Sequence, residues 1–230
     1  MSSQQTYNDL KKRLHGHRMT QIVELITHKR VADIGTDHGY IPIFAVLGGQ
    51  ADYVLGCDIV PGPLSTAEKN VVTYGLQDHI ELRLGNGLAP VTLADNIDTI
   101  TITGMGGPTI IDILKGNTPV AQAAKQLILS PQSSIPSVRR YVHQLGFAID
   151  RETILRENDR FYHLINCIRG EETYTEAEYQ LGKRLLAEKS PVFLDYIAEE
   201  IAHLERILQN PVDMNKREQL QGLIALYQTV

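Results

Sequence analysis

The stretch RVADIGTDHGY, residues 30–40, decides the fold of this chain of 230 residues. Its first half is a short apolar run closed by a glycine, which predicts a buried β-strand. Gly35 and Gly39 then bound a tight turn of the kind that leads from a strand into a cofactor-binding helix. Such a loop usually has a further glycine between these two, but this chain has Asp37 there. The charge of Asp37 therefore indicates which class of ligand the loop can bind.

Short apolar strands and helical segments alternate on both sides of this stretch. Because the strands are apolar throughout and helices lie between them, they should form a parallel sheet that is covered on both faces. Besides the strand at 30–35, we predict strands at residues 53–59, 80–87, 97–104 and 125–131, and helices at 20–28, 40–48, 63–74, 108–115 and 135–145.

Two further strands, predicted at residues 146–157 and 160–170, have no helix between them. They should form an antiparallel hairpin at one edge of the sheet, joined around Asn158–Asp159. Five parallel strands followed by an antiparallel pair are the α/β, Rossmann-like architecture of class I methyltransferases. Doubly wound NAD-binding domains normally stay parallel to their last strand. We therefore predict a class I methyltransferase domain in residues 1–170.

Residues 171–230 have a helical pattern throughout. Apolar residues recur every three or four positions, and Asn210–Pro211 interrupts the pattern. We predict a second domain here, a helical hairpin that resembles a short antiparallel coiled coil. It could pack on the first domain, bind a macromolecular substrate or form an oligomer interface. The recurring apolar residues are Phe193, Ile197, Ile201, Leu204, Leu208, Leu220, Ile224 and Tyr227.

The composition, with 43% hydrophobic and 21% charged residues, is that of a soluble globular protein. No apolar run approaches the ~18 residues of a membrane span, and the N-terminus lacks the apolar segment of a secretory signal. Cys57 and Cys167 lie far apart, with no CxxC pair and no histidine at metal-ligand spacing. This pattern predicts reduced, buried thiols and no metal site. We expect a cytoplasmic protein, with a monomer favoured.

Small or polar residues follow four consecutive strands of the predicted sheet. Ligands of open parallel sheets bind beyond the carboxyl ends of the strands, so these four loops should meet at one site. Taken singly, each loop also has the composition of an ordinary turn. The candidate cofactor-binding residues are Asp33, Gly35, Thr36, Asp37, His38, Gly39, Asp58, Ile59, Asn86, Gly87, Gly104, Met105 and Gly106.

Asp37 argues against a phosphate-bearing ligand. A dinucleotide would bring its pyrophosphate to the N-terminus of the helix after the loop, where repulsion by a carboxylate would cost on the order of several kcal/mol. S-adenosylmethionine instead has a sulfonium and an ammonium, which Asp37 and nearby Asp33 would attract. Asp58 can accept hydrogen bonds from ribose hydroxyls, and Asn86 can bond the edge of the adenine. S-adenosylmethionine is therefore the predicted cofactor.

Several motifs together resemble the bacterial tRNA (adenine-22-N1)-methyltransferase family. They are DIGTDHGYIP at 33–42, CDIVPGPLSTAEKN at 57–70, RLGNGL at 83–88 and ITGMGG at 102–107, and the resemblance extends over nearly the whole chain. It implies that S-adenosylmethionine donates a methyl group to N1 of an adenine in the D-arm region of tRNA. The family usually has an aspartate where this chain has Asn86, which keeps a hydrogen-bond acceptor without the charge.

The implied reaction depends mostly on positioning, because N1 of an adenine that has left its stack has a free lone pair. Asp37 is the candidate catalytic residue, since a carboxylate between cofactor and base would stabilise the charge that develops on the purine. His38 is an alternative proton acceptor, or a packing residue at the start of a helix. Residues 104–107 would line a slot for the purine, with Gly106 and Gly107 as substrate contacts. N6-amine methyltransferases have Asn/Asp-Pro-Pro-aromatic there, so GMGG favours attack by a ring nitrogen.

A basic run near the N-terminus offers phosphate contacts for tRNA, the predicted partner. Its Lys11, Lys12, Arg13 and Arg18 are candidate substrate-binding residues, or a solvated helix face. The net charge of −5 does not oppose this, because residues 1–170 have 16 basic and 16 acidic side chains while residues 171–230 have 6 and 11. Two alternatives stay open: a methyltransferase that acts on another RNA or a small molecule, and a non-catalytic protein that binds tRNA or the cofactor.

Overall fold

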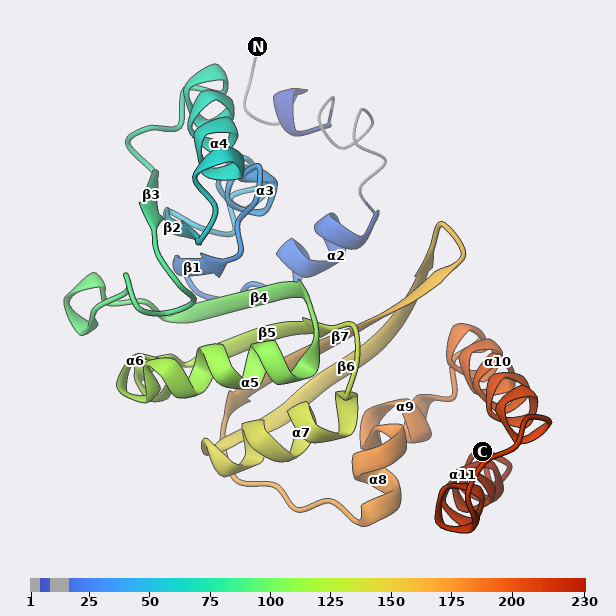
Figure 1. Ribbon diagram of the computed structural model, residues 1–230. Coiled ribbons are helices and arrows are strands. Elements are labelled where there is room, and N and C mark those ends of the chain that lie inside the picture. Colours follow the sequence, from blue (N-terminus) through green and yellow to red (C-terminus); the bar gives the residue numbers. More distant parts are fainter. Residues whose placement is uncertain (1–4, 9–16) are drawn as a thin grey trace.

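The computed structural model describes residues 5–8 and 17–230, and its centre is a sheet of seven strands in the order β3-β2-β1-β4-β5-β7-β6 (Figure 1). Strands β1 to β5 are parallel, and β7 and β6 are antiparallel at one edge. This arrangement confirms the predicted class I methyltransferase sheet. The strands are β1 Arg30–Ile34, β2 Tyr53–Asp58, β3 Ile80–Leu84, β4 Thr99–Met105, β5 Gln126–Pro131, β6 Phe147–Glu157 and β7 Arg160–Arg169.

Helices cover both faces of this sheet (Figure 1). On one face α2, α3 and α4 pack through a core that includes Ile22 and Phe44. On the other face α5, α6 and α7 pack through a core that includes Ile110 and Val142. The helices are α2 His17–Glu24, α3 Tyr40–Leu47, α4 Pro61–Thr73, α5 Gly107–Gly116, α6 Thr118–Ala123 and α7 Ile135–Gln144.

The strands and most helices lie within a few residues of the predicted ranges. The β6–β7 turn is formed by Asn158 and Asp159, as expected, and both residues have φ in the left-handed region, at 50° and 57°. A two-residue hairpin turn of type I′ requires this conformation, which Asn and Asp tolerate well. Two short elements, α6 and the 3-10 turn η1 (Leu93–Asp95), were not predicted. They are too short for apolar periodicity to be recognised.

The C-terminal segment contains four helices where a single hairpin was expected. They are α8 Glu176–Leu181, α9 Lys183–Glu188, α10 Pro191–Leu208 and α11 Met214–Tyr227. The hairpin itself is formed by α10 and α11, which share a core that includes Phe193, Leu204 and Leu220. Gly182 separates α8 from α9 with φ of 91°. A side chain there would be strained, so the glycine ends the first helix.

A buried ion pair connects α8 to the sheet. Arg139 of α7 is 1% exposed, and its guanidinium donates to the Glu152 carboxylate on β6, with a shortest distance of 2.7 Å. The same guanidinium donates to the backbone oxygens of Tyr179 and Gln180, at 2.7 and 2.9 Å. Arg139 therefore fixes the start of the C-terminal segment against α7 and β6. The domain boundary between residues 170 and 171 stays a prediction.

Candidate functional site

A cavity of about 430 Å³, here called the first cavity, lies at the carboxyl ends of β1, β2, β3 and β4. Its position is the usual ligand position of open α/β sheets, because β1 lies between β2 and β4 and the strand order reverses there. The loops after all four strands reach it, as predicted. The predicted residues that line it are Arg18, Gly35, Thr36, Asp37, His38, Asp58, Ile59, Asn86, Gly87, Gly104 and Met105.

Four of the predicted residues that the structure describes do not line this cavity. Gly39 lies where α3 approaches α4, and a Cβ there would be 3.1 Å from the Cβ of Ala67. The backbone N–H of Gly107 donates to the carbonyl oxygen of Ser133 at 3.0 Å, and a Cβ at Gly107 would be 2.4 Å from that oxygen. Both glycines therefore allow close packing behind the site. The four residues are Asp33, Gly39, Gly106 and Gly107.

The cavity also has an apolar wall that sequence analysis did not find. Met19 and Ile22 come from α2, Tyr40 and Ile41 from α3, and Ile113 from α5. These residues look like ordinary core positions in the sequence. Only the packing of the helices against the sheet brings them to the cavity, so no local pattern could have marked them.

The loop after β1 explains why Asp37 can stand where a glycine is usual. Gly35 and Asp37 both have φ in the left-handed region, at 74° and 51°. Apart from glycine, Asp and Asn adopt this conformation most readily. The loop is anchored by the backbone N–H groups of Gly35 and Thr36, which donate to the Cys57 carbonyl oxygen at 2.8 and 3.0 Å. Asp37 thus keeps the backbone geometry of a glycine loop and adds a negative charge.

Asp58 connects the loops after β1 and β2. Its Oδ2 accepts a hydrogen bond from the backbone N–H of Asp37, and its Oδ1 accepts one from that of Val60, both at 2.9 Å. The residue is 8% exposed. Because an ionised carboxylate has about four acceptor positions, each oxygen can still accept one further bond from a ligand.

Asp33 is a buried carboxyl group behind the loop. Its Oδ1 accepts a hydrogen bond from the Thr101 hydroxyl at 2.6 Å, and its Oδ2 has no hydrogen-bond partner among the described residues. Burial raises the pKa of Asp33 to about 6, and the bond from Thr101 opposes that rise. A cation placed near Oδ2 would stabilise the ionised form.

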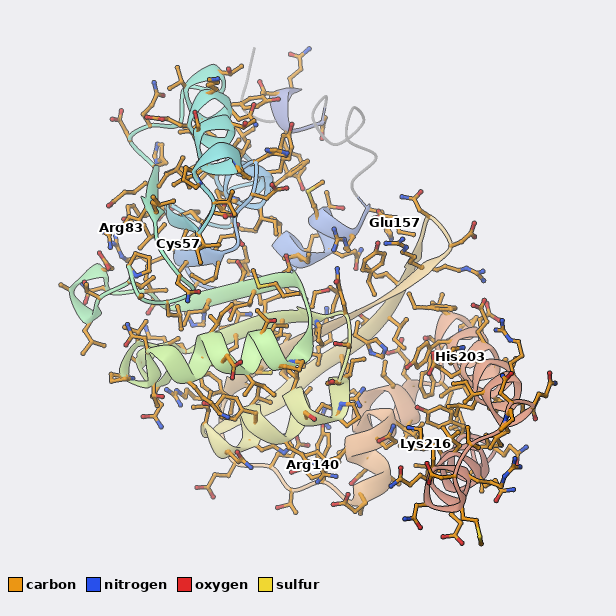
Figure 2. The ribbon with its side chains drawn as sticks, in the orientation of Figure 1. Cys57, Arg83, Arg140, Glu157, His203 and Lys216 are labelled. Carbon is orange, nitrogen blue, oxygen red and sulfur yellow. The ribbon has the colours of Figure 1, made fainter. Side chains whose placement is uncertain are left out.

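Arg18 brings a positive charge to the wall of the cavity. Its guanidinium lies 4.5 Å from the centre of the Tyr162 ring, and its Nε lies 3.9 Å from Oε2 of Glu157. Figure 2 shows Glu157 on the β6–β7 hairpin beside α2. Arg18 therefore joins α2 to the hairpin. Lys11, Lys12 and Arg13 lie outside the described residues, so their role stays a prediction.

Cys57 and Cys167 are both buried and unpaired, as predicted, and burial raises the pKa of the Cys57 thiol to about 12. In residues 5–8 and 17–230, no group of three His, Cys, Asp or Glu side chains could hold a metal ion. Within the same ranges, no helix has the length and apolar character needed to cross a membrane.

Comparison with known sequences identifies relatives over most of the chain. The sequence model of the tRNA (adenine(22)-N(1))-methyltransferase family matches residues 31–228. The tRNA (adenine(22)-N(1))-methyltransferase of Bacillus subtilis is 32% identical over 199 residues, which cover 84% of this chain and 83% of that protein.

Comparison with solved structures gives the same result. Sp1610 of Streptococcus pneumoniae, solved in complex with S-adenosyl-L-methionine, has a TM-score of 0.86 and 31% identity, covering 92% of this chain and 97% of that one. TrmK of M. capricolum, solved with the cofactor product S-adenosyl-homocysteine, has a TM-score of 0.85 and 31% identity, covering 93% and 96%. The likeness therefore extends over nearly the whole chain.

Proposed function

The chain belongs to the tRNA (adenine(22)-N(1))-methyltransferase family, and we propose that it methylates N1 of adenine 22 in tRNA with S-adenosylmethionine as the methyl donor. The observation that carries this proposal is the carboxylate of Asp37, which lies in the first cavity in the loop that a dinucleotide would need for its pyrophosphate. Such a site disfavours a pyrophosphate and favours a ligand with cationic groups.

The residues of the first cavity, together with Asp33 behind its loop, fit S-adenosylmethionine. Asp58 has an open acceptor position on each oxygen for the two ribose hydroxyls. Ile59, whose side chain is 61% exposed at the cavity wall, offers an apolar surface for the adenine ring. Asn86 would bond the adenine edge. Asp33 is a buried carboxyl with an oxygen that lacks a partner among the described residues, which suits the ammonium group.

When bound, S-adenosylmethionine supplies an electrophilic methyl group, and the protein contributes position and charge. The side chain of Asp37 is 66% exposed and lies 3.7 Å from Nε2 of His38, as measured from Oδ1. We assign Asp37 the task of stabilising the positive charge that develops on the purine when N1 is alkylated. We also assign His38 the task of taking up the N6 proton when the product loses it. Met105, which closes over Gly35, forms the apolar side of the slot for the base.

The proposal includes tRNA as the partner, contacted by Arg18 and the basic run at residues 11–13. We also propose a monomer that acts in the cytoplasm and needs no metal ion. The buried, unpaired state of Cys57 and Cys167 supports a reducing compartment. The α10–α11 hairpin is proposed to contact the tRNA away from the target base.

The test is methyl transfer to an unmodified tRNA transcript. The protein is incubated with labelled S-adenosylmethionine and either the natural transcript or one in which adenine 22 is replaced by guanine. We expect label in the first transcript only, recovered as 1-methyladenosine after digestion. Equal labelling of both transcripts, a different methylated nucleoside, or no transfer by a protein that binds S-adenosylmethionine would contradict the proposal.

A further inference from the structure

A second cavity, of about 540 Å³, lies next to the first. It is an open cavity bordered by the loop after β5, the start of β7 and one side of α10. Nothing described so far gives it a role. The side chains on which its chemistry depends are Arg160, Phe161, Tyr162, His163, Tyr196 and Glu200.

The two cavities share a wall of backbone. Met105 lines the first cavity, and its carbonyl oxygen accepts a hydrogen bond at 2.8 Å from the N–H of Gln132, which lines the second. The N–H of Gly107 donates to the oxygen of Ser133, another residue of the second cavity, at 3.0 Å. A side chain at Gly107 would collide with that oxygen, so the glycine keeps this wall thin.

The side chain of Arg18 also connects the two cavities. Arg18 lines the first cavity, and its guanidinium stacks on the ring of Tyr162, which lines the second, with 4.5 Å to the ring centre. An RNA strand that delivers one base to the first cavity must pass its backbone close by. Arg18 is placed to meet a phosphate at that point, and the exposed Arg160 adds a second cation at the second cavity.

The interior of the second cavity suits a nucleobase better than a phosphate. Three aromatic rings, those of Phe161, Tyr162 and Tyr196, contribute to its wall, and aromatic rings of this kind stack on bases of any sequence. The carboxylate of Glu200 is in the same wall and would repel a phosphate. Tyr196 is held in place by edge contacts with Phe161 and His163, at centre distances of 5.4 and 5.0 Å, so the cavity is preformed.

His163 supplies a polar group to the wall of the second cavity. It is 5% exposed, and neither ring nitrogen has a hydrogen-bond partner among the described residues. The nearest carboxylate oxygen, Oε1 of Glu152, lies 3.9 Å from Nδ1, which is too far for a hydrogen bond. Burial lowers the pKa of His163, so the ring is neutral and offers one donor and one acceptor. The edge of a base offers the same combination.

We propose that the second cavity binds the base of the nucleotide next to the target adenine in the tRNA strand. This inference rests on the proposed function, because it assumes that the first cavity holds the target base. The neighbouring base lies against the aromatic rings with its edge toward His163, while Arg18 and Arg160 contact the backbone. Holding this second base keeps the RNA strand in place while the target adenine is out of its stack.

Phe161 is the residue to change, because a ring can be replaced without altering the charge of the site. We compare Phe161→Leu, which keeps an apolar side chain, with Phe161→Tyr, which keeps the ring. If the ring stacks on a base, Phe161→Leu should lower kcat/KM for an unmodified tRNA transcript about tenfold, while Phe161→Tyr stays within about twofold of the wild type. Affinity for S-adenosylmethionine should not change in either variant.

A matched pair of arginine variants tests whether Arg160 contacts the RNA backbone at the second cavity. Arg160 and Arg151 are both exposed residues of the β6–β7 hairpin, and only Arg160 lines the second cavity. Arg160→Ala should raise the KM for tRNA several-fold, and Arg151→Ala should leave it unchanged. Equal effects of the two substitutions would show that the hairpin contributes only a general positive charge, against the proposal.

The deciding measurement uses tRNA substrates with a single abasic nucleotide on the 5′ or the 3′ side of the target adenine. For one of these substrates, the wild type and Phe161→Leu should have the same kcat/KM, because the base that Phe161 contacts is absent. An equal loss on intact and abasic substrates would assign the ring to packing and overturn the inference. If the wild type methylates no tRNA, the proposed function fails; if it methylates tRNA and Phe161→Leu has no effect, only this inference fails.

Discussion

The two cavities share a wall but are built in different ways. The first is formed by loops that follow four strands of one sheet, and carboxylates are prominent among its charged groups. The second is formed by three segments that are far apart in the chain, and aromatic rings and a neutral histidine give it its chemistry. The difference indicates a division of tasks: charge selects a cationic cofactor in the first cavity, and stacking selects an RNA base in the second.

The largest effect should come from removing the charge of Asp37. Asparagine tolerates the left-handed backbone conformation that Asp37 adopts, so Asp37→Asn changes the charge and spares the loop. We expect kcat to fall at least tenfold, and the affinity for S-adenosylmethionine to fall by a smaller factor, because Asp58 and Asp33 keep their charges. Steady-state methylation of tRNA gives the first quantity, and calorimetry gives the second.

The control for this substitution is Asp112→Asn, which neutralises an exposed aspartate of α5 that lines neither cavity. It should methylate tRNA at the rate of the wild type. Equal activity of the two variants would remove Asp37 from the reaction and leave the first cavity with a cofactor-binding task only.

A smaller and different effect should follow from Asp58→Asn. An amide has one oxygen, so its NH2 group would face the N–H of either Asp37 or Val60, and one hydrogen bond of the loop would be lost. We expect the Kd for S-adenosylmethionine to rise about tenfold, equivalent to about 1.4 kcal/mol. The KM for tRNA should change little. A normal cofactor affinity would show that Asp58 serves the loop alone.

Asp33, behind the first cavity, makes the stability of the protein sensitive to pH. Its pKa is about 6 in the folded protein and 3.8 when exposed, so the folded state holds a proton that the unfolded state releases between these values. Stability contributed by this group is therefore greatest below pH ~4, falls as the pH rises from ~4 to ~6, and is lower by on the order of 3 kcal/mol above that range. The protein is less stable above this range because Asp33 is then ionised, which is the form that a cation would bind.

Asp33→Asn removes this titration and should keep the bond from Thr101. In denaturant unfolding, the free energy of unfolding of Asp33→Asn should increase relative to that of the wild type as the pH rises from 4 to 7. The variant should also bind S-adenosylmethionine more weakly. Parallel stability curves for the two proteins would contradict the assignment of a raised pKa to Asp33.

The smallest effect is expected for Arg18→Ala, at the junction of the cavities. Arg18 is already close to Glu157, so a phosphate would compete for a partly neutralised charge. We expect about a threefold rise in the KM for tRNA and a weaker dependence of that KM on salt. A loss of cofactor affinity of the same size would place Arg18 in the first cavity only.

Sequence reasoning reached the first cavity and missed the second for a physical reason. Asp37 and Asp58 lie at or just beyond the carboxyl ends of neighbouring parallel strands, and topology alone brings such residues together. Phe161, His163 and Tyr196 meet only because α10 returns to the start of β7, and their spacing in the chain says nothing of that contact. The same applies to the helices, where the hairpin of α10 and α11 follows from apolar periodicity but α8 and α9 do not.

The most direct measurement compares Asp58→Asn with Phe161→Leu in one set of assays, giving the Kd for S-adenosylmethionine and the KM for tRNA of each variant. If the two cavities have separate tasks, Asp58→Asn should raise the Kd for S-adenosylmethionine and leave the KM for tRNA nearly unchanged, and Phe161→Leu should do the reverse. If both variants alter both constants in the same proportion, the cavities act as one site and the division of tasks is wrong.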